Sequence, residues 1–131
     1  TWRGMLNLGL DPYAQATHLL FDFLRRLTTD MPEWYMPKLS PEQERCLVDA
    51  FGRVPDHRDN DGIVPSRSQV WGEVIHAVRA DHFDVIGHFA EPKSMPPHFD
   101  WLASGSAFNL KRFEALWHSV AAFIAADSRT S

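Results

Sequence analysis

The chain has 131 residues, of which 44% are hydrophobic and 23% charged, a composition typical of a folded protein with its own core. The net charge of -4 at pH 7 offers no basic face to phosphate groups, which argues against nucleic acid as a partner. No stretch approaches the ~18 consecutive apolar residues of a membrane span, so no transmembrane segment is expected.

The single cysteine, Cys46, allows no disulfide bond within the chain. The sequence begins at Thr1, without an initiator Met or a signal-like apolar region, which indicates a processed or truncated product. The localisation therefore stays open between secreted and cytoplasmic.

One strand and one helix are predicted in the first 30 residues. Residues 4–10 are a short apolar run, typical of a buried strand. Asp11 is expected to cap a helix that begins at Pro12 and ends near Asp30. Apolar residues follow at helical spacing, namely Leu19, Leu20, Phe23, Leu24 and Leu27.

A second helix follows a connection rich in proline and aromatic residues, residues 31–39. Ser40 and Gln43 have the spacing of a capping box, with Pro at the first helical position. The helix is expected over residues 41–51, and Gly52 is a good terminator.

Residues 53–66 are polar and rich in turn formers, and one or two helical turns are predicted over residues 66–72. The alternation in residues 73–79 predicts a short strand, although a single helix over residues 68–80 is the alternative. After a loop at residues 91–106, apolar spacing predicts a final amphipathic helix from about Asn109 to Ala126, packed on a core.

The predicted elements are about four helices and two short strands. Two strands cannot form an independent sheet of useful size. The helices would then have to cover a sheet built from other residues, so we expect a protein of the α/β class whose sheet is incomplete in this chain.

Asp61 and His82 are the residues best suited to catalysis. Asp61 lies in a tight turn that Gly62 allows, and His82 follows the predicted strand. A carboxylate and an imidazole on neighbouring loops can meet, so that Asp61 accepts from one ring N–H and leaves the other nitrogen as a general base. Taken singly, Asn60-Asp61-Gly62 is more often a plain turn, and such a histidine is more often a surface residue.

Two segments resemble a known family. NDGIVPSRSQVWG (residues 60–72) resembles the acid loop of bacterial triacylglycerol lipases and related esterases, and ADHFDVIG (residues 80–87) resembles their histidine loop. The order Ser…Asp…His of α/β-hydrolases places these segments last. The resemblance implies the C-terminal portion of an α/β-hydrolase, with residues 1–52 as a late strand plus a helical cap insertion. Residues 53–131 would then hold the acid loop, the histidine loop and the C-terminal helix.

The nucleophile of such an enzyme is missing from the chain. No G-x-S-x-G sequence occurs, and Ser104-Gly105-Ser106 lacks the flanking glycines and comes in the wrong order. The resemblance implies that the serine lies in a remaining N-terminal part of the hydrolase, which is the expected partner. The 131 residues alone are expected to be inactive.

The substrate is expected to be an ester with an apolar acyl group. By the resemblance, Ile63, Val64 and Phe83 would contact it. Phe21, Phe23 and the cluster at residues 34–36 would either face the acyl chain or pack the cap on the body, and both readings remain open.

No cofactor is required for this chemistry, but a structural Ca²⁺ is a candidate. Asp84 matches a carboxylate that such lipases use to bind calcium, while His88 stands where they offer an amide. Asp84 as a loop cap or as the partner of an arginine is the alternative. Residues 57–68 lack the ligands of an EF-hand loop, and the seven histidines show no zinc spacing.

The sequence therefore favours a carboxylic ester hydrolase that uses a Ser-His-Asp triad. The first alternative is a non-catalytic fragment that binds lipid or a partner and needs a separate N-terminal chain. The second is a transferase with the same triad, which would differ in what attacks the acyl-enzyme.

Overall fold

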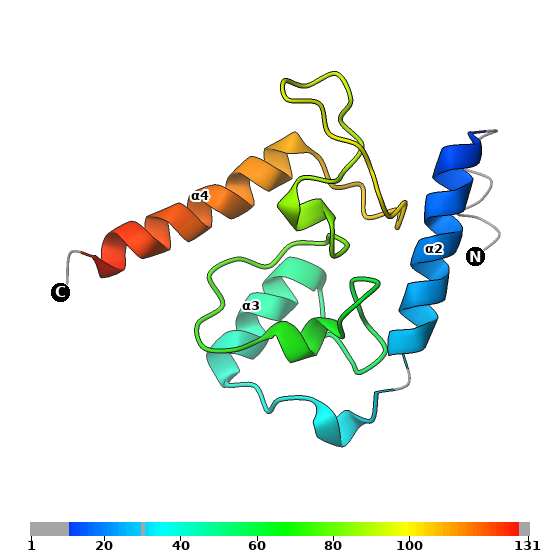
Figure 1. Cartoon of the computed structure of the whole chain (residues 1–131). Coiled ribbons are helices and arrows are strands. Elements are labelled where there is room, and N and C mark those ends of the chain that lie inside the picture. The colour runs from blue at the N-terminus through cyan, green and yellow to red at the C-terminus, as the bar shows by residue number, and fades with distance from the viewer. Residues whose placement is uncertain (1–10, 30, 129–131) are drawn as a thin grey trace.

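The computed structural model describes residues 11–29 and 31–128. Its regular elements are three α-helices and three short 3₁₀ helices: α2 (Pro12–Thr28), η1 (Glu33–Tyr35), α3 (Pro41–Phe51), η2 (Ser66–Gln69), η3 (Asp84–Ile86) and α4 (Leu110–Asp127). These described ranges contain no β-strand. The expected α/β class is therefore wrong for this part of the chain, which consists of helices and long loops (Figure 1).

The strand predicted at residues 73–79 is wrong, and so is the alternative helix over residues 68–80. Alternation alone does not make a strand, because a strand needs a neighbour that accepts and donates its backbone hydrogen bonds. No backbone group of residues 73–80 bonds to the backbone of another described residue. The other predicted strand, residues 4–10, lies outside the described residues.

Local capping residues define the two N-terminal helices, as predicted. Asp11 accepts a hydrogen bond from the Tyr13 backbone N–H at 3.0 Å, and α2 follows. Ser40 and Gln43 form the predicted capping box, with distances of 3.2 Å and 2.7 Å between side chain and backbone. Gly52, with φ of 78°, ends α3.

The last predicted helix is also present, but its packing differs from the expectation. Asn109 caps α4 through the Arg112 backbone N–H. No described side chain of α4 is buried, and Ile124 is 62% exposed. The helix projects from the body (Figure 1), and its residues 121–127 are exposed.

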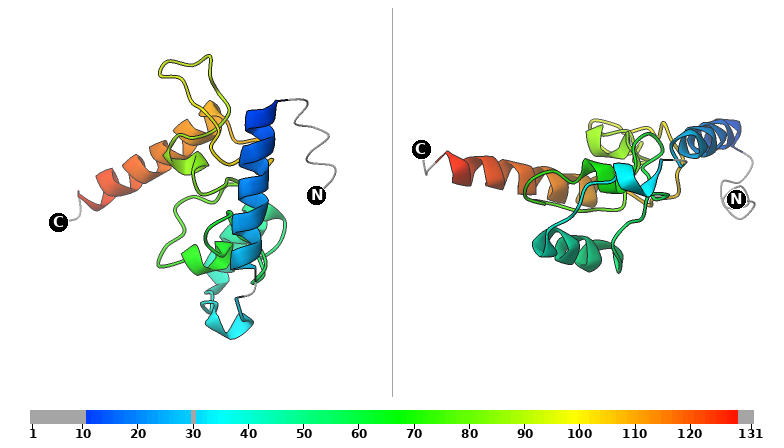
Figure 2. Two further views of the ribbon diagram at one scale, coloured as in Figure 1. Left: turned by 45° about the vertical axis from the view of Figure 1, so that its right-hand side comes forward. Right: turned by 90° about the horizontal axis from the view of Figure 1, so that it is seen from below.

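The helices lie around loops rather than in layers. Figure 2 shows α2 and α4 at opposite ends of the molecule. Among the described residues, and apart from proline, the buried apolar side chains are few: Met36, Leu47, Phe89, Leu102, Ala103 and Phe108. Helix α2 is held by long-range hydrogen bonds, from Tyr13 Oη to the Asp100 carbonyl (2.9 Å), between His18 Nδ1 and the Ala103 carbonyl (2.7 Å), and from Asn60 Nδ2 to the Arg25 carbonyl (3.3 Å). The loops that carry Asp61 and His82 lie between these helices.

Candidate functional site

The acid loop forms a tight turn at residues 61–64, and its backbone N–H groups bind the Asp61 carboxylate. The Asp61 N–H donates to the Val64 carbonyl at 3.1 Å, which closes the turn, and Gly62 has φ of 98°. One carboxylate oxygen, Oδ1, accepts the backbone N–H groups of Ile63 (3.0 Å) and Val64 (2.7 Å). The carboxylate is thus fixed by the loop itself, and its other oxygen is directed out of the turn.

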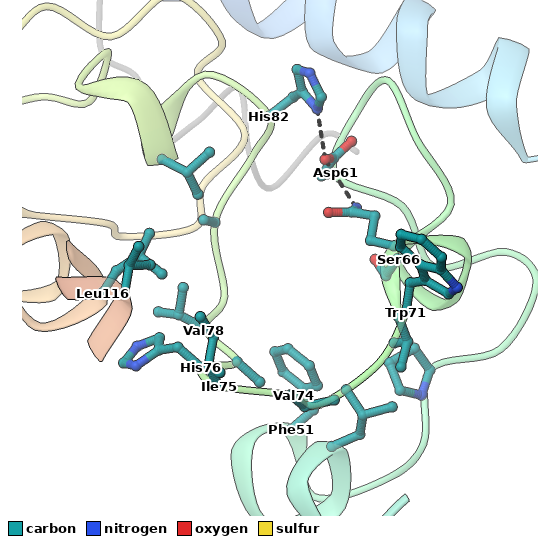
Figure 3. A pocket seen from close by; sticks show the side chains of 18 of the residues that line it. Phe51, Asp61, Ser66, Trp71, Val74, Ile75, His76, Val78, His82 and Leu116 are labelled. Atoms are coloured by element: carbon teal, nitrogen blue, oxygen red, sulfur yellow. Dashed lines mark hydrogen bonds and ion pairs between the residues drawn. The ribbon is translucent and has the colours of Figure 1, made fainter. Parts of the chain in front are cut away.

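The structure brings His82 to that second oxygen. The His82 Nδ1 lies 2.9 Å from Asp61 Oδ2 (Figure 3). The His82 backbone N–H donates to the Asp61 carbonyl, also at 2.9 Å. The Asp61 side chain is 12% exposed and the His82 side chain 41%. No described residue bonds to the other ring nitrogen, Nε2. An ionised Asp61 favours the tautomer with the proton on Nδ1, which leaves Nε2 as a proton acceptor.

The histidine loop is built on two buried aspartates, Asp81 and Asp84, which are each 2% exposed. Asp81 Oδ1 accepts the backbone N–H groups of Phe83 and Asp84, and Asp84 Oδ2 accepts the backbone N–H of Asp81 at 2.9 Å. These reciprocal bonds hold His82 in a fixed turn.

Two serines complete this network. Ser104 Oγ donates to Asp81 Oδ2, and Ser106 Oγ donates to Asp84 Oδ2, both at 2.7 Å. The Ser-Gly-Ser segment, which lacks the surroundings of a nucleophile in the sequence, therefore anchors the histidine loop through its hydroxyl groups.

Burial changes the acidity of the carboxyl groups in this region. It raises the pKa of Asp84 to about 7, and the negative charge of Asp81 adds to the effect. Burial also raises the pKa of Asp81, against the hydrogen bond from Ser104. In the same way, burial and the charge of Asp81 raise the pKa of Asp100 to about 6. The histidine loop therefore rests on carboxyl groups that disfavour their charged forms.

The structural Ca²⁺ expected at Asp84 stays a prediction. Calcium needs six to eight oxygen ligands, whereas Asp84 Oδ2 is already engaged by Asp81 and Ser106. His88, four residues on, is stacked on Trp101 with ring centroids 3.6 Å apart. The described residues contain no group of three His, Cys, Asp or Glu side chains that could hold a metal. In the described structure Asp84 caps the turn that holds the histidine loop.

Asp61 and His82 lie at one rim of a cavity of about 530 Å³ (Figure 3). Its walls come from α3, from α4 and from the irregular connection at residues 70–80. The apolar side chains that line it include Leu47, Phe51, Val74, Ile75, Val78 and Leu116. His76, which also lines the cavity, bonds through Nδ1 to Ser119 of α4 at 3.0 Å.

The residues predicted to contact substrate do not line this cavity. Ile63 and Val64 contribute backbone N–H groups to Asp61 instead. Phe83 lies with its ring edge-on to His82, with centroids 5.9 Å apart. The cavity therefore gives no support to the prediction that Ile63, Val64 and Phe83 contact the substrate.

The cap residues are divided between packing and exposure. Met36 is buried, and Phe21 packs against Gly62. Trp34 is 80% exposed and Phe23 60%. The structure thus favours a packing role for the first two residues and leaves the other two on the surface.

Gln69 is a site residue that the sequence does not predict. Gln69, at the end of η2, donates from Nε2 to Asp61 Oδ2 at 3.1 Å. The only hint in the sequence is the helical turn predicted over residues 66–72, which contains Gln69 but does not reveal the direction of its side chain.

No family, curated protein or solved structure with which the chain was compared matches it. Within the described residues, no helix is long and apolar enough to cross a membrane.

Proposed function

We propose that Asp61 and His82 are the acid and the base of a carboxylic ester hydrolase. The observation that carries the proposal is the 2.9 Å contact between His82 Nδ1 and Asp61 Oδ2, together with a free Nε2 beside a cavity. The nucleophilic serine would come from the remaining part of the hydrolase, because residues 1–131 contain no G-x-S-x-G sequence.

In this mechanism His82 moves protons and Asp61 holds it in position. Nε2 takes the proton of the serine hydroxyl as the serine oxygen attacks the acyl carbon, and then returns the proton to the leaving alcohol. Water hydrolyses the acyl-enzyme by the same exchange in reverse. Throughout, Asp61 accepts from Nδ1–H and stabilises the imidazolium, while Ile63 and Val64 fix the carboxylate through their backbone.

The apolar walls of the neighbouring cavity support an ester whose acyl group is apolar. Medium or long acyl chains, or a polyester, are the proposed substrates. The chemistry requires no cofactor, and a structural Ca²⁺ at Asp84 stays a prediction.

A binding role without catalysis is the second candidate. It is supported by an exposed apolar stripe on α2, formed by Leu19, Phe23 and Leu27, which are 58%, 60% and 65% exposed. In that case the chain would bind lipid or a partner through α2, and replacing His82 would not change this binding.

The test is hydrolysis of a p-nitrophenyl ester by the polypeptide that the whole gene encodes. His82→Ala should lose about 10⁴-fold or more in kcat, because the proton acceptor is gone. His118→Ala is the matched control, since His118 is exposed on α4 and bonds only to the backbone of its own helix. Full activity in His82→Ala would rule out His82 as the base, whereas no hydrolysis by the unchanged polypeptide would rule out the hydrolase and leave the binding role.

A further inference from the structure

Asp61 Oδ2 accepts two side-chain donors, not one. His82 Nδ1 lies at 2.9 Å and Gln69 Nε2 at 3.1 Å from the same oxygen. A carboxylate oxygen has two lone pairs, so one donor occupies each of them. The two bonds from Ile63 and Val64 to Oδ1 complete the set, and the carboxylate has four donors among the described residues.

Gln69 lies beside Asp61 because it belongs to η2. Other hydrogen bonds, which do not involve Asp61, hold η2 in place. The Ser66 N–H donates to the Asp59 carbonyl at 2.8 Å. The Arg67 guanidinium donates to the Pro37 carbonyl at 3.1 Å and 3.2 Å and pairs with Glu33. The helical turn therefore keeps its place when the Gln69 side chain changes, and the side chain itself is exposed.

The hydrogen bond from the Gln69 side-chain amide affects how the Asp61 carboxylate is oriented. The backbone bonds to Oδ1 fix one side of the group. The Asp61 side chain lines the cavity and is 12% exposed, so the two side-chain donors decide how Oδ2 is bonded. With Gln69 on one lone pair of Oδ2, only the other is open, and it points to Nδ1 of His82. A fixed acceptor at Nδ1 selects the tautomer that leaves Nε2 unprotonated.

We propose that Gln69 is a positioning residue that orients the Asp61 carboxylate and thereby sets the tautomer of His82. This inference rests on the proposed function for its catalytic meaning. The tautomer itself can be measured on the 131-residue chain without any substrate, so the two proposals can fail separately.

The experiment is the ¹⁵N spectrum of the imidazole rings in the ¹⁵N-histidine-labelled chain, recorded at a pH where the rings are neutral. In the unchanged chain His82 should be mainly the Nδ1–H tautomer. In Gln69→Leu the ratio of Nδ1–H to Nε2–H should fall about five-fold, the loss of one ordinary hydrogen bond. Gln69→Lys, which restores a donor, should recover the ratio.

Two further variants separate the outcomes. Gln43→Leu is the matched control, because it breaks the bonds of Gln43 to Ser40 and Gly72, away from Asp61, and should leave His82 unchanged. Asp61→Asn should place the proton on Nε2, since the amide nitrogen then faces Nδ1. A ratio that changes in Asp61→Asn but not in Gln69→Leu overturns the role of Gln69 alone. A ratio unchanged in Asp61→Asn overturns the Asp61–His82 pair as well.

Discussion

At the scale of single residues, the site depends on Gly62 as much as on the groups that carry its chemistry. Gly62 follows Asp61 and adopts φ of 98°, which L side chains rarely take. It is buried, and a Cβ at this position would lie 2.9 Å from two ring carbons of Phe21 in α2. The glycine thus allows both the turn that presents Asp61 and the close approach of α2.

Gly62→Ala should lower the free energy of unfolding by on the order of 1–3 kcal/mol, because it combines a strained φ with a clash. Chemical denaturation followed by tryptophan fluorescence measures this change. Gly72→Ala is the control, since Gly72 also has a positive φ of 70° but has no atom within 4 Å of the new Cβ. An equal loss in both variants would show that contact with Phe21 contributes nothing.

At the scale of elements, the helices could be predicted because their determinants are local. The side chains of Asp11 and Ser40 bond within three residues of their own position, and Gly52 ends α3 by its own φ. The strand at residues 73–79 could not be excluded from sequence, because a strand depends on a neighbour that alternation does not reveal. The hydrogen bond from Ser104 to Asp81 could not be predicted from the sequence either, because it joins residues 23 positions apart.

The histidine loop should make stability depend on pH. Asp84 has a folded-state pKa of about 7, above the ordinary value of 3.8, so folding favours its protonated form. Its contribution is fully present below about pH 4 and is lost as the pH rises through about 7. The free energy of unfolding, measured in urea, should therefore be lower at pH 8 than at pH 5. Asp81 and Asp100 act in the same direction.

Asp84→Asn should reduce this decrease, because the amide oxygen can still accept from Asp81 and Ser106 but carries no charge. Asp49→Asn, an exposed change on α3, should keep the decrease. If wild type and Asp84→Asn lose the same stability between pH 5 and pH 8, another group is responsible.

At the scale of the whole molecule, the site is the meeting point of two loops beside an open cavity. The order of the loops and the separation of Asp61 and His82 by 21 residues pointed to their contact before the structure did. The contribution of Gln69 depends on the placement of η2, which Arg67 secures on Pro37 some 30 residues away. No local sequence pattern indicates that distant contact, so the second side-chain donor to Asp61, Gln69, could not be predicted.

The most direct test of the central claim is a double-mutant cycle on ester hydrolysis by the polypeptide of the whole gene. If Asp61 acts only through His82, Asp61→Asn should cost about 10⁴-fold in kcat in the wild-type background and almost nothing in the His82→Ala background. Losses that multiply in the double variant would contradict the claim, because they would show that the two residues act independently.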